Sequence, residues 1–308
     1  MDAPDEDVTR GCALGLLAVV LFALTLPMTR LAVGDVGAPQ LSPAFVTAGR
    51  AAFAGLLSVA YLRAVGARRP SRAHMPALAV CALGTVVGFP LALALALREV
   101  DAMHAAVVTG VLPLATAVVG ALALRQRPSR AFWACAVLGA ALVVTFAAVA
   151  GGGALAAADG WLLLAVASAA CGDVAGARVA TAMPAAQVIC WVLVASLPLT
   201  LPATLAAWPP QPVPALAWAG FAYVALCSMW LGFFAWYRAL ALGGVVRVSQ
   251  VQLLQPFVAL VAAWALLGET LQPATVAFAL AVAGVVFLGR RRPVGGTTPV
   301  GNRSRRRT

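Results

Sequence analysis

Long apolar runs separated by short polar joins dominate the sequence from one end to the other. A helix needs about 20 apolar residues to cross the hydrocarbon core of a bilayer, and the chain contains ten runs of about that length. They span residues 11–31, 41–62, 75–97, 102–124, 131–149, 160–178, 185–206, 215–237, 247–267 and 273–289. The runs lack the alternation of apolar and polar positions that is typical of membrane β-strands. The pattern therefore predicts an all-α integral membrane protein with ten transmembrane helices.

The composition excludes several classes of protein. Apolar residues make up 63% of the chain and charged residues only 10%, whereas about a quarter of the residues in soluble domains are charged. All 21 basic residues are arginine, and the absence of lysine excludes a P-loop ATPase and a Schiff-base enzyme. The six cysteines lie singly inside apolar runs, and the two histidines have no acidic partner at ligand spacing. We therefore expect no disulfide framework, no metal and no cofactor.

The distribution of the arginines predicts the topology. If the N-terminus is cytoplasmic, 18 of the 21 arginines fall in the N-terminal tail, the inner joins and the C-terminal tail, and the outer joins hold only Arg98. This excess indicates a protein of the cell (inner) membrane whose two termini both lie in the cytoplasm. It also accounts for the net charge of +11 without a nucleic-acid partner. The N-terminal segment is acidic, unlike that of a signal peptide, so we expect the first helix to be retained.

An internal repeat is visible around two prolines, Pro113 and Pro256, which lie 143 residues apart. The same offset superimposes residues 91–114 on 234–257 and continues without a gap to Gln126, opposite Glu269. Each half has five predicted helices, and an odd number makes the two halves inverted repeats, as in many secondary transporters. The predicted divisions are a cytoplasmic tail 1–10, a first repeat 11–149, an outer linker 150–159, a second repeat 160–290 and a basic cytoplasmic tail 291–308.

Four motifs carry a family resemblance. They are Leu26-Pro27-Met28-Thr29-Arg30, Ala48-Gly49-Arg50-Ala51-Ala52-Phe53-Ala54, Gln255-Pro256 and Leu266-Leu267-Gly268-Glu269-Thr270-Leu271. On these motifs the chain resembles the EamA family of the drug/metabolite transporter superfamily over roughly residues 11–290. The resemblance implies a ten-helix carrier that exports, less often imports, small metabolites, amino acids or drugs. The family usually shows a Gly-Glu ending after helix four as well, where this chain has Arg125 and Gln126.

Two charged residues fall inside predicted helices and are candidates for the substrate path. Arg50 lies near the middle of helix two, where it either binds a substrate carboxylate or phosphate or bonds to carbonyls of a broken helix. Asp173 lies in helix six and either carries a coupling proton or pairs with Arg178, Arg50 or a helix terminus.

Neutral residues supply further candidates. Trp230, Phe233, Phe234 and Tyr237 share one face of helix eight at α-helical spacing. This stripe either stacks on a substrate, through Trp230 and Tyr237 above all, or packs against neighbours and lipid. Gln252 and Gln255 either hydrogen-bond a substrate or join helices. Pro113 and Pro256 are candidate kinks: either they let their helices bend during gating, or they are static kinks.

At the outer side, Arg30 ends helix one and His104 begins helix four. We expect them either to cap helices and reach the interface or to line an outer vestibule in which His104 titrates.

These features predict a secondary transporter that exports a small molecule across a lipid bilayer by alternating access, without covalent chemistry. Protons are a further candidate partner, and the sequence leaves open whether the protein forms a homodimer. Two alternatives stay open: an uncoupled facilitator, and a membrane-embedded lipid-modifying enzyme. The enzyme is disfavoured because the predicted spans hold no cluster of acidic residues or histidines.

Overall fold

A computed structural model describes residues 3–123, 129–180, 182–243 and 249–290 of the chain. Within these ranges every regular element is a helix, apart from one isolated bridge between Gly34 and Pro39. Eight of the described helices are long and apolar enough to cross a membrane, and two shorter apolar helices follow, Val251–Leu267 and Pro273–Gly289. These ten segments agree with the predicted apolar runs to within a few residues, so the predicted all-α fold with ten helical segments is confirmed.

Five of the ten segments are continuous α-helices. They are α3 (Pro43–Ala64), α8 (Arg130–Ala150), α9 (Ala157–Val179), α10 (Ala185–Ala206) and α15 (Pro273–Arg290). The hydroxyl of Ser42 caps α3 by accepting from the Phe45 backbone N–H at 3.0 Å, and Ser129 caps α8 in the same way. These caps satisfy N–H groups that have no partner inside the helix.

The other five segments are interrupted. They are α1 (Ala3–Ala23) with α2 (Thr25–Val33); η1 (Arg72–His74) and α4 (Met75–Cys81), the π-helix η2 (Ala82–Gly88) and α5 (Phe89–Ala96); α6 (Ala102–Thr109) with α7 (Leu112–Ala123); α11 (Ala215–Ala222), the π-helix η3 (Tyr223–Leu231) and α12 (Gly232–Gly243); and the 3₁₀ turn η4 (Ser249–Leu254) with α14 (Gln255–Leu267).

Prolines mark four of these interruptions. Pro27, Pro90, Pro113 and Pro256 each lie in the first turn of the segment that follows the break. A proline has no N–H, and in the first turn of a helix that group would have no helical partner anyway. The prolines therefore start new helical segments rather than bend continuous ones.

The offset of 143 residues recurs in the positions of the elements. It relates the first residues of α5 and α12, of α7 and α14, and of α8 and α15, and it places the π-helix η2 within η3. π-Helices are rare, so two of them at equivalent positions are strong evidence for duplication. The structure confirms the two-repeat architecture.

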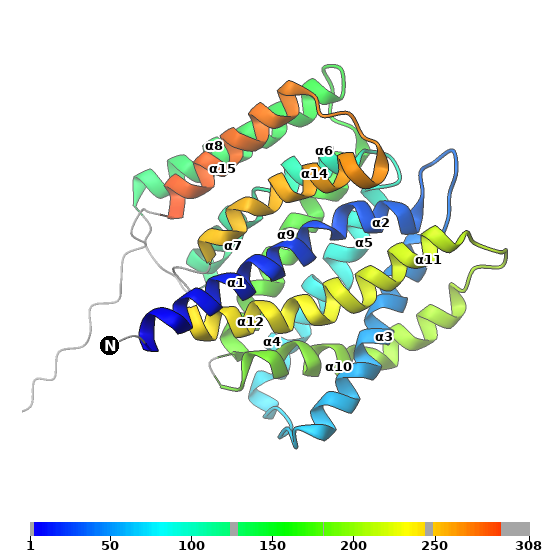
Figure 1. Cartoon of the computed structure of the whole chain (residues 1–308), viewed down its shortest axis with the longest axis vertical. Coiled ribbons are helices and arrows are strands. Elements are labelled where there is room, and N and C mark those ends of the chain that lie inside the picture. The colour runs from blue at the N-terminus through cyan, green and yellow to red at the C-terminus, as the bar shows by residue number, and fades with distance from the viewer. Residues whose placement is uncertain (1–2, 124–128, 181, 244–248, 291–308) are drawn as a thin grey trace, which may run out of the picture.

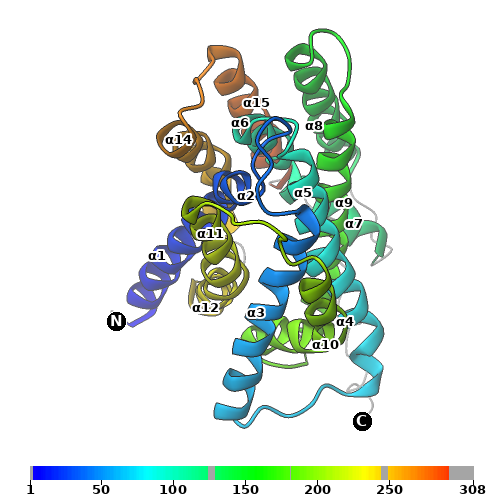
Figure 2. The same cartoon turned by 90° about the vertical axis from the view of Figure 1, so that its right-hand side faces the viewer.

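The two repeats interlock. Equivalent helices pack against each other, α3 against α10 and α8 against α15, and these pairs form opposite edges of the bundle (Figure 1). Between the edges, α1 packs against α12, and α9 packs against α5 and α7 (Figure 2). We call the end that holds residues 34–42, 98–101, 151–156, 207–214 and 268–272 the outer end, and the opposite end, toward the label N in Figure 1, the inner end.

Aromatic side chains fill part of the outer end, where α3 meets α11. The ring of Phe45, which is 1% exposed, lies 5.2–5.7 Å from the rings of Trp208, Trp218 and Phe221. Phe45 belongs to the first repeat and the other three residues to the second, so this contact joins the repeats at the outer end.

Candidate functional site

A cavity of about 380 Å³ lies in the middle of the bundle, lined by helices of both repeats. On α9, which runs from the outer to the inner end, the lining residues fall between Ala169 and Ala177, in its second half. The segment formed by η3 and α12 also runs toward the inner end, and its lining residues fall between Ser228 and Trp236. The cavity therefore extends from the middle of the bundle toward the inner end.

Arg50 lies about two turns into α3 and lines this cavity, although only 3% of its surface is exposed. Its Nη2 donates a hydrogen bond to Ser228 Oγ at 3.0 Å. Its Nε is buried and has no hydrogen-bond partner among the described residues. A guanidinium carries five N–H donors, so Arg50 has donors left for a further acceptor. One of the two alternatives predicted from the sequence was that Arg50 bonds to backbone carbonyls of a broken helix. In the structure Arg50 instead donates to a side-chain hydroxyl.

Ser228 joins three helical segments. It lies on the π-helix η3 and accepts hydrogen bonds from Arg50 on α3 and from the hydroxyl of Thr25 on α2, the latter at 2.7 Å. Its repeat equivalent, Thr85 on η2, also lines the cavity. The sequence analysis missed both hydroxyls. The signal that identifies them is a hydroxyl residue at the same place in two otherwise apolar repeats.

Asp173 on α9 also lines the cavity and is exposed to it. Within the described part of the chain no ion pair joins Asp173 to Arg50 or to Arg178, the two arginine partners expected from the sequence. Arg178 instead donates to the carbonyl of Ala123 at 2.9 Å. Among the described residues that line the cavity, Arg50 and Asp173 carry opposite charges and do not pair with each other.

The glutamine and proline candidates lie together. Gln252 in η4, Gln255 and Pro256 at the start of α14, and Pro113 at the start of α7 all line the cavity. Pro113 and Pro256 therefore mark helix breaks beside the cavity, as does Pro90, which also lines it.

The predicted aromatic stripe of helix eight is divided. Phe233 lines the cavity and packs edge-on against Phe22, and Trp236 also lines the cavity. Trp230 is not among the cavity-lining residues and packs against Phe234 and Tyr61. The π-helix η3 ends at Leu231, within the predicted stripe, and Trp230 and Phe234, four residues apart, still contact each other as α-helical spacing predicts. The side chain of Tyr237 lies outside the described residues.

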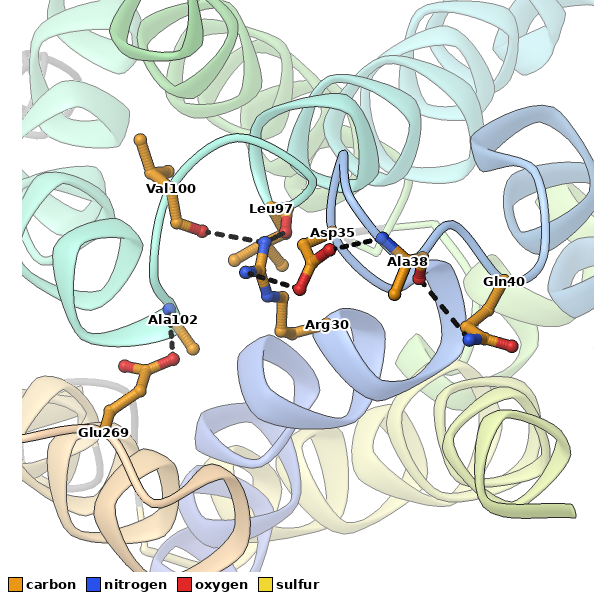
Figure 3. Close-up of polar contacts among 8 residues, drawn as sticks. All are labelled: Arg30, Asp35, Ala38, Gln40, Leu97, Val100, Ala102 and Glu269. Atoms are coloured by element: carbon orange, nitrogen blue, oxygen red, sulfur yellow. Dashed lines mark hydrogen bonds and ion pairs between the residues drawn. The ribbon is translucent and has the colours of Figure 1, made fainter. Parts of the chain in front are cut away.

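The two candidates at the outer side, Arg30 and His104, lie in different surroundings. Arg30 donates to the carbonyls of Leu97 and Val100 and lies 3.8 Å from Asp35 (Figure 3). It lines a second cavity, of about 370 Å³, at the outer end. His104 is not among the residues that line this second cavity, and its Nε2 lies 2.7 Å from Oδ1 of Asp159 on α9. This acidic partner lies 55 residues away in the sequence and was missed.

Comparison with known proteins places the fold in a family. The sequence profile of the EamA-like transporter family matches residues 9–147 and, a second time, residues 156–290. The chain belongs to the EamA-like transporter family.

Two curated relatives of this EamA-like transporter match over nearly their whole lengths. The "Uncharacterized transporter YdeK" of Bacillus subtilis (strain 168) is 42% identical over 287 residues, covering 92% of this chain and 98% of the relative. A "Probable terminal-alkyne amino-acid exporter" of Streptantibioticus cattleyicolor is 30% identical over 290 residues, covering 90% and 92%. A solved crystal structure has the same fold, with a TM-score of 0.61 and 20% identity, covering 91% of this chain and 96% of that one. The EamA-like transporter is therefore a multi-pass membrane protein.

Proposed function

We propose that this transporter exports a small zwitterionic metabolite of amino-acid size by alternating access, with the central cavity as its binding site. The observation that carries the proposal is Arg50, a buried guanidinium that lines the cavity and has an unused donor. A charge inside a membrane protein is costly unless it faces water or a partner. A guanidinium binds carboxylates through two parallel hydrogen bonds, so a carboxylate is the group we assign to Arg50.

Asp173 supplies the second half of the recognition. It faces the same cavity without pairing to Arg50, so its carboxylate is available to an ammonium group or to a proton. The ammonium group and the proton compete for the same carboxylate. This competition couples export of the substrate to entry of a proton. An uncoupled facilitator, the alternative within transport, does not need this residue.

The size and the lining of the cavity agree with a substrate of this class. About 380 Å³ lies at the lower end of the range for small-molecule pockets, which are mostly apolar with a few polar groups. Phe22, Phe233 and Trp236 supply apolar surface for a substrate side chain, and Gln252 and Gln255 supply neutral hydrogen-bonding groups.

The comparisons support transport and the direction of export. One relative, 30% identical, is named as an amino-acid exporter, and the family and the other relative are named as transporters. These names disfavour the competing class, a membrane-embedded lipid-modifying enzyme.

We also propose that the protein lies in the cell membrane with both termini in the cytoplasm, and that its repeats comprise residues 11–149 and 160–290. The excess of arginine at the inner end supports this orientation. In this orientation the inner end faces the cytoplasm, so the central cavity extends toward the cytoplasm.

Transport of matched solutes by purified protein in proteoliposomes tests the substrate class. The panel contains neutral amino acids, the corresponding amines without the carboxylate, and the corresponding acids without the amino group. We expect carrier-dependent exchange of at least one amino acid, and at least about tenfold slower exchange of both truncated forms, since each leaves one buried charge without its partner. Equal exchange of an amino acid and its amine would overturn the assignment of Arg50.

A further inference from the structure

Glu269 forms a polar contact between the repeats at the outer end. It lies between α14 and α15, and its carboxylate reaches the start of α6 in the other repeat. Oε1 accepts from the Ala102 backbone N–H at 2.7 Å and Oε2 accepts from the Met103 N–H at 2.8 Å. Figure 3 shows the first of these bonds beside the contacts of Arg30.

The local geometry favours a carboxylate at this position. Gly268 caps the C-terminal end of α14 with φ +69°, a left-handed conformation that suits glycine and ends the helix directly before Glu269. The first N–H groups of a helix have no partner inside the helix, and its N-terminus carries partial positive charge. A carboxylate offers an acceptor oxygen to each of two N–H groups, whereas a glutamine side chain offers only one oxygen.

The segment on which Glu269 acts is held firmly within its own repeat. Arg30 on α2 binds the carbonyls of Leu97 and Val100, which precede α6. The start of α6 and the end of α2 therefore form one unit of the first repeat, and Glu269 links that unit to the second repeat.

The first turn of α6 separates the two cavities. Asp101, which precedes it, lines the outer cavity together with Glu269. Ala106, one turn further along α6, lines the central cavity, as does Thr109. A solute that leaves the central cavity toward the outer end by this route passes the contact between Glu269 and α6.

We propose that Glu269 is an outer gate residue: its bond to the first turn of α6 holds the outer end shut, and release of that bond allows the central cavity to open outward. The proposal rests on the alternating access of the proposed function. Two contacts join the repeats at the outer end, the aromatic one at Phe45 and the charged one at Glu269. Apolar packing does not change when a proton binds, whereas a carboxylate contact does.

Protons act on this gate in a defined direction. Burial raises the pKa of the Glu269 carboxyl, and the neighbouring Asp101 carboxylate raises it further, while the backbone N–H groups of Met103 and Ala102 and the charge of Arg30 oppose the rise. Asp35 faces the same outer cavity. A protonated carboxyl loses its charge and part of its acceptor capacity. A fall in external pH therefore weakens the contact with α6.

Cysteine labelling from outside tests the gate without any knowledge of the substrate. The reporter is Thr109→Cys, placed in a full-length protein whose six native cysteines are replaced by alanine. A membrane-impermeant maleimide is added to the outer side of right-side-out vesicles. We expect slow labelling with Glu269 intact and about tenfold faster labelling with Glu269→Gln. Labelling with Glu269 intact rises as the external pH is lowered, and labelling of Glu269→Gln does not.

Two further variants complete the test. Glu99→Gln is the matched control, because Glu99 is an exposed carboxylate at the same end, and its labelling stays at the level of the unaltered reporter. Ala102→Pro removes one donor without changing Glu269, at the first helical position, where proline is tolerated, and is expected to label faster. Unchanged labelling in both Glu269→Gln and Ala102→Pro would overturn the gate. Failure to transport any amino acid while labelling responds as stated would overturn only the proposed substrate.

Discussion

Arg50 and Ser228 meet across the two repeats, 178 residues apart in the sequence, with Arg50 Nη2 3.0 Å from Ser228 Oγ. Thr25 donates to the same oxygen at 2.7 Å. The serine therefore fixes a buried arginine against the wall of the central cavity and ties α2 and α3 to η3. This contact joins the proposed substrate site to the packing between the repeats.

Replacement of Ser228 by alanine removes the hydrogen-bond acceptor of Arg50. We expect the KM for the exported solute to rise about tenfold with a smaller change in kcat, because the guanidinium is no longer held in its binding orientation. The free energy of unfolding should fall by about 2 kcal/mol. Transport kinetics and thermal unfolding measure the two effects.

Ser196→Ala is the matched control for this variant. Ser196 is buried in α10 and donates only to Val192 of its own helix, at 2.8 Å. Its loss should leave KM unchanged. A KM that rises equally in both serine variants would show that the effect is not specific to Arg50.

A second prediction concerns the packing of α9 against η2. A Cβ at Gly172 would lie 2.4 Å from Thr85 Oγ1 and 2.9 Å from the Thr85 backbone nitrogen. Gly172→Ala should therefore destabilise the protein by about 1–3 kcal/mol, the usual effect of overpacking. Gly160 lies on the same helix with nothing within 4 Å of its Cβ position, and Gly160→Ala should be neutral or slightly stabilising. Thermal unfolding of the two variants compares them directly, and equal melting temperatures would contradict the packing.

A third prediction separates coupled export from facilitated diffusion. Asp173→Asn removes the carboxylate that we assign to the proton and the ammonium, so accumulation of solute driven by a pH gradient should be lost. Exchange at equal pH should persist with weaker binding. Accumulation in proteoliposomes with and without a pH gradient measures this difference. Unchanged uphill accumulation in Asp173→Asn would show that Asp173 does not couple transport to protons.

Much of the fold could be predicted from the sequence, because the bilayer imposes simple rules. The length and continuity of the apolar runs predict the helices, and the offset between Pro113 and Pro256 predicts the repeat, with the π-helices at matching positions as independent evidence. The interruptions were less predictable. The π-turn in η3 has no proline nearby that would indicate it.

The candidate site could be predicted only in part, because its contacts join residues far apart in the chain. Arg50 and Asp173 stand out as charges in apolar helices, which is a local signal. The bonds of Arg50 to Ser228 and of Glu269 to the start of α6 span more than 160 residues. No spacing in the sequence reports such contacts, since they depend on how the two repeats interlock.

The central claim is that Arg50 binds the carboxylate of an exported zwitterion. Counterflow of a labelled amino acid into proteoliposomes, with Arg50→Gln compared with Arg63→Gln, tests it most directly. Both arginines lie on α3, but Arg63 is exposed near the end of the helix. We predict saturable counterflow in the unaltered protein and in Arg63→Gln, and a loss of at least about 100-fold in kcat/KM in Arg50→Gln. Equal counterflow in the two variants would contradict the account.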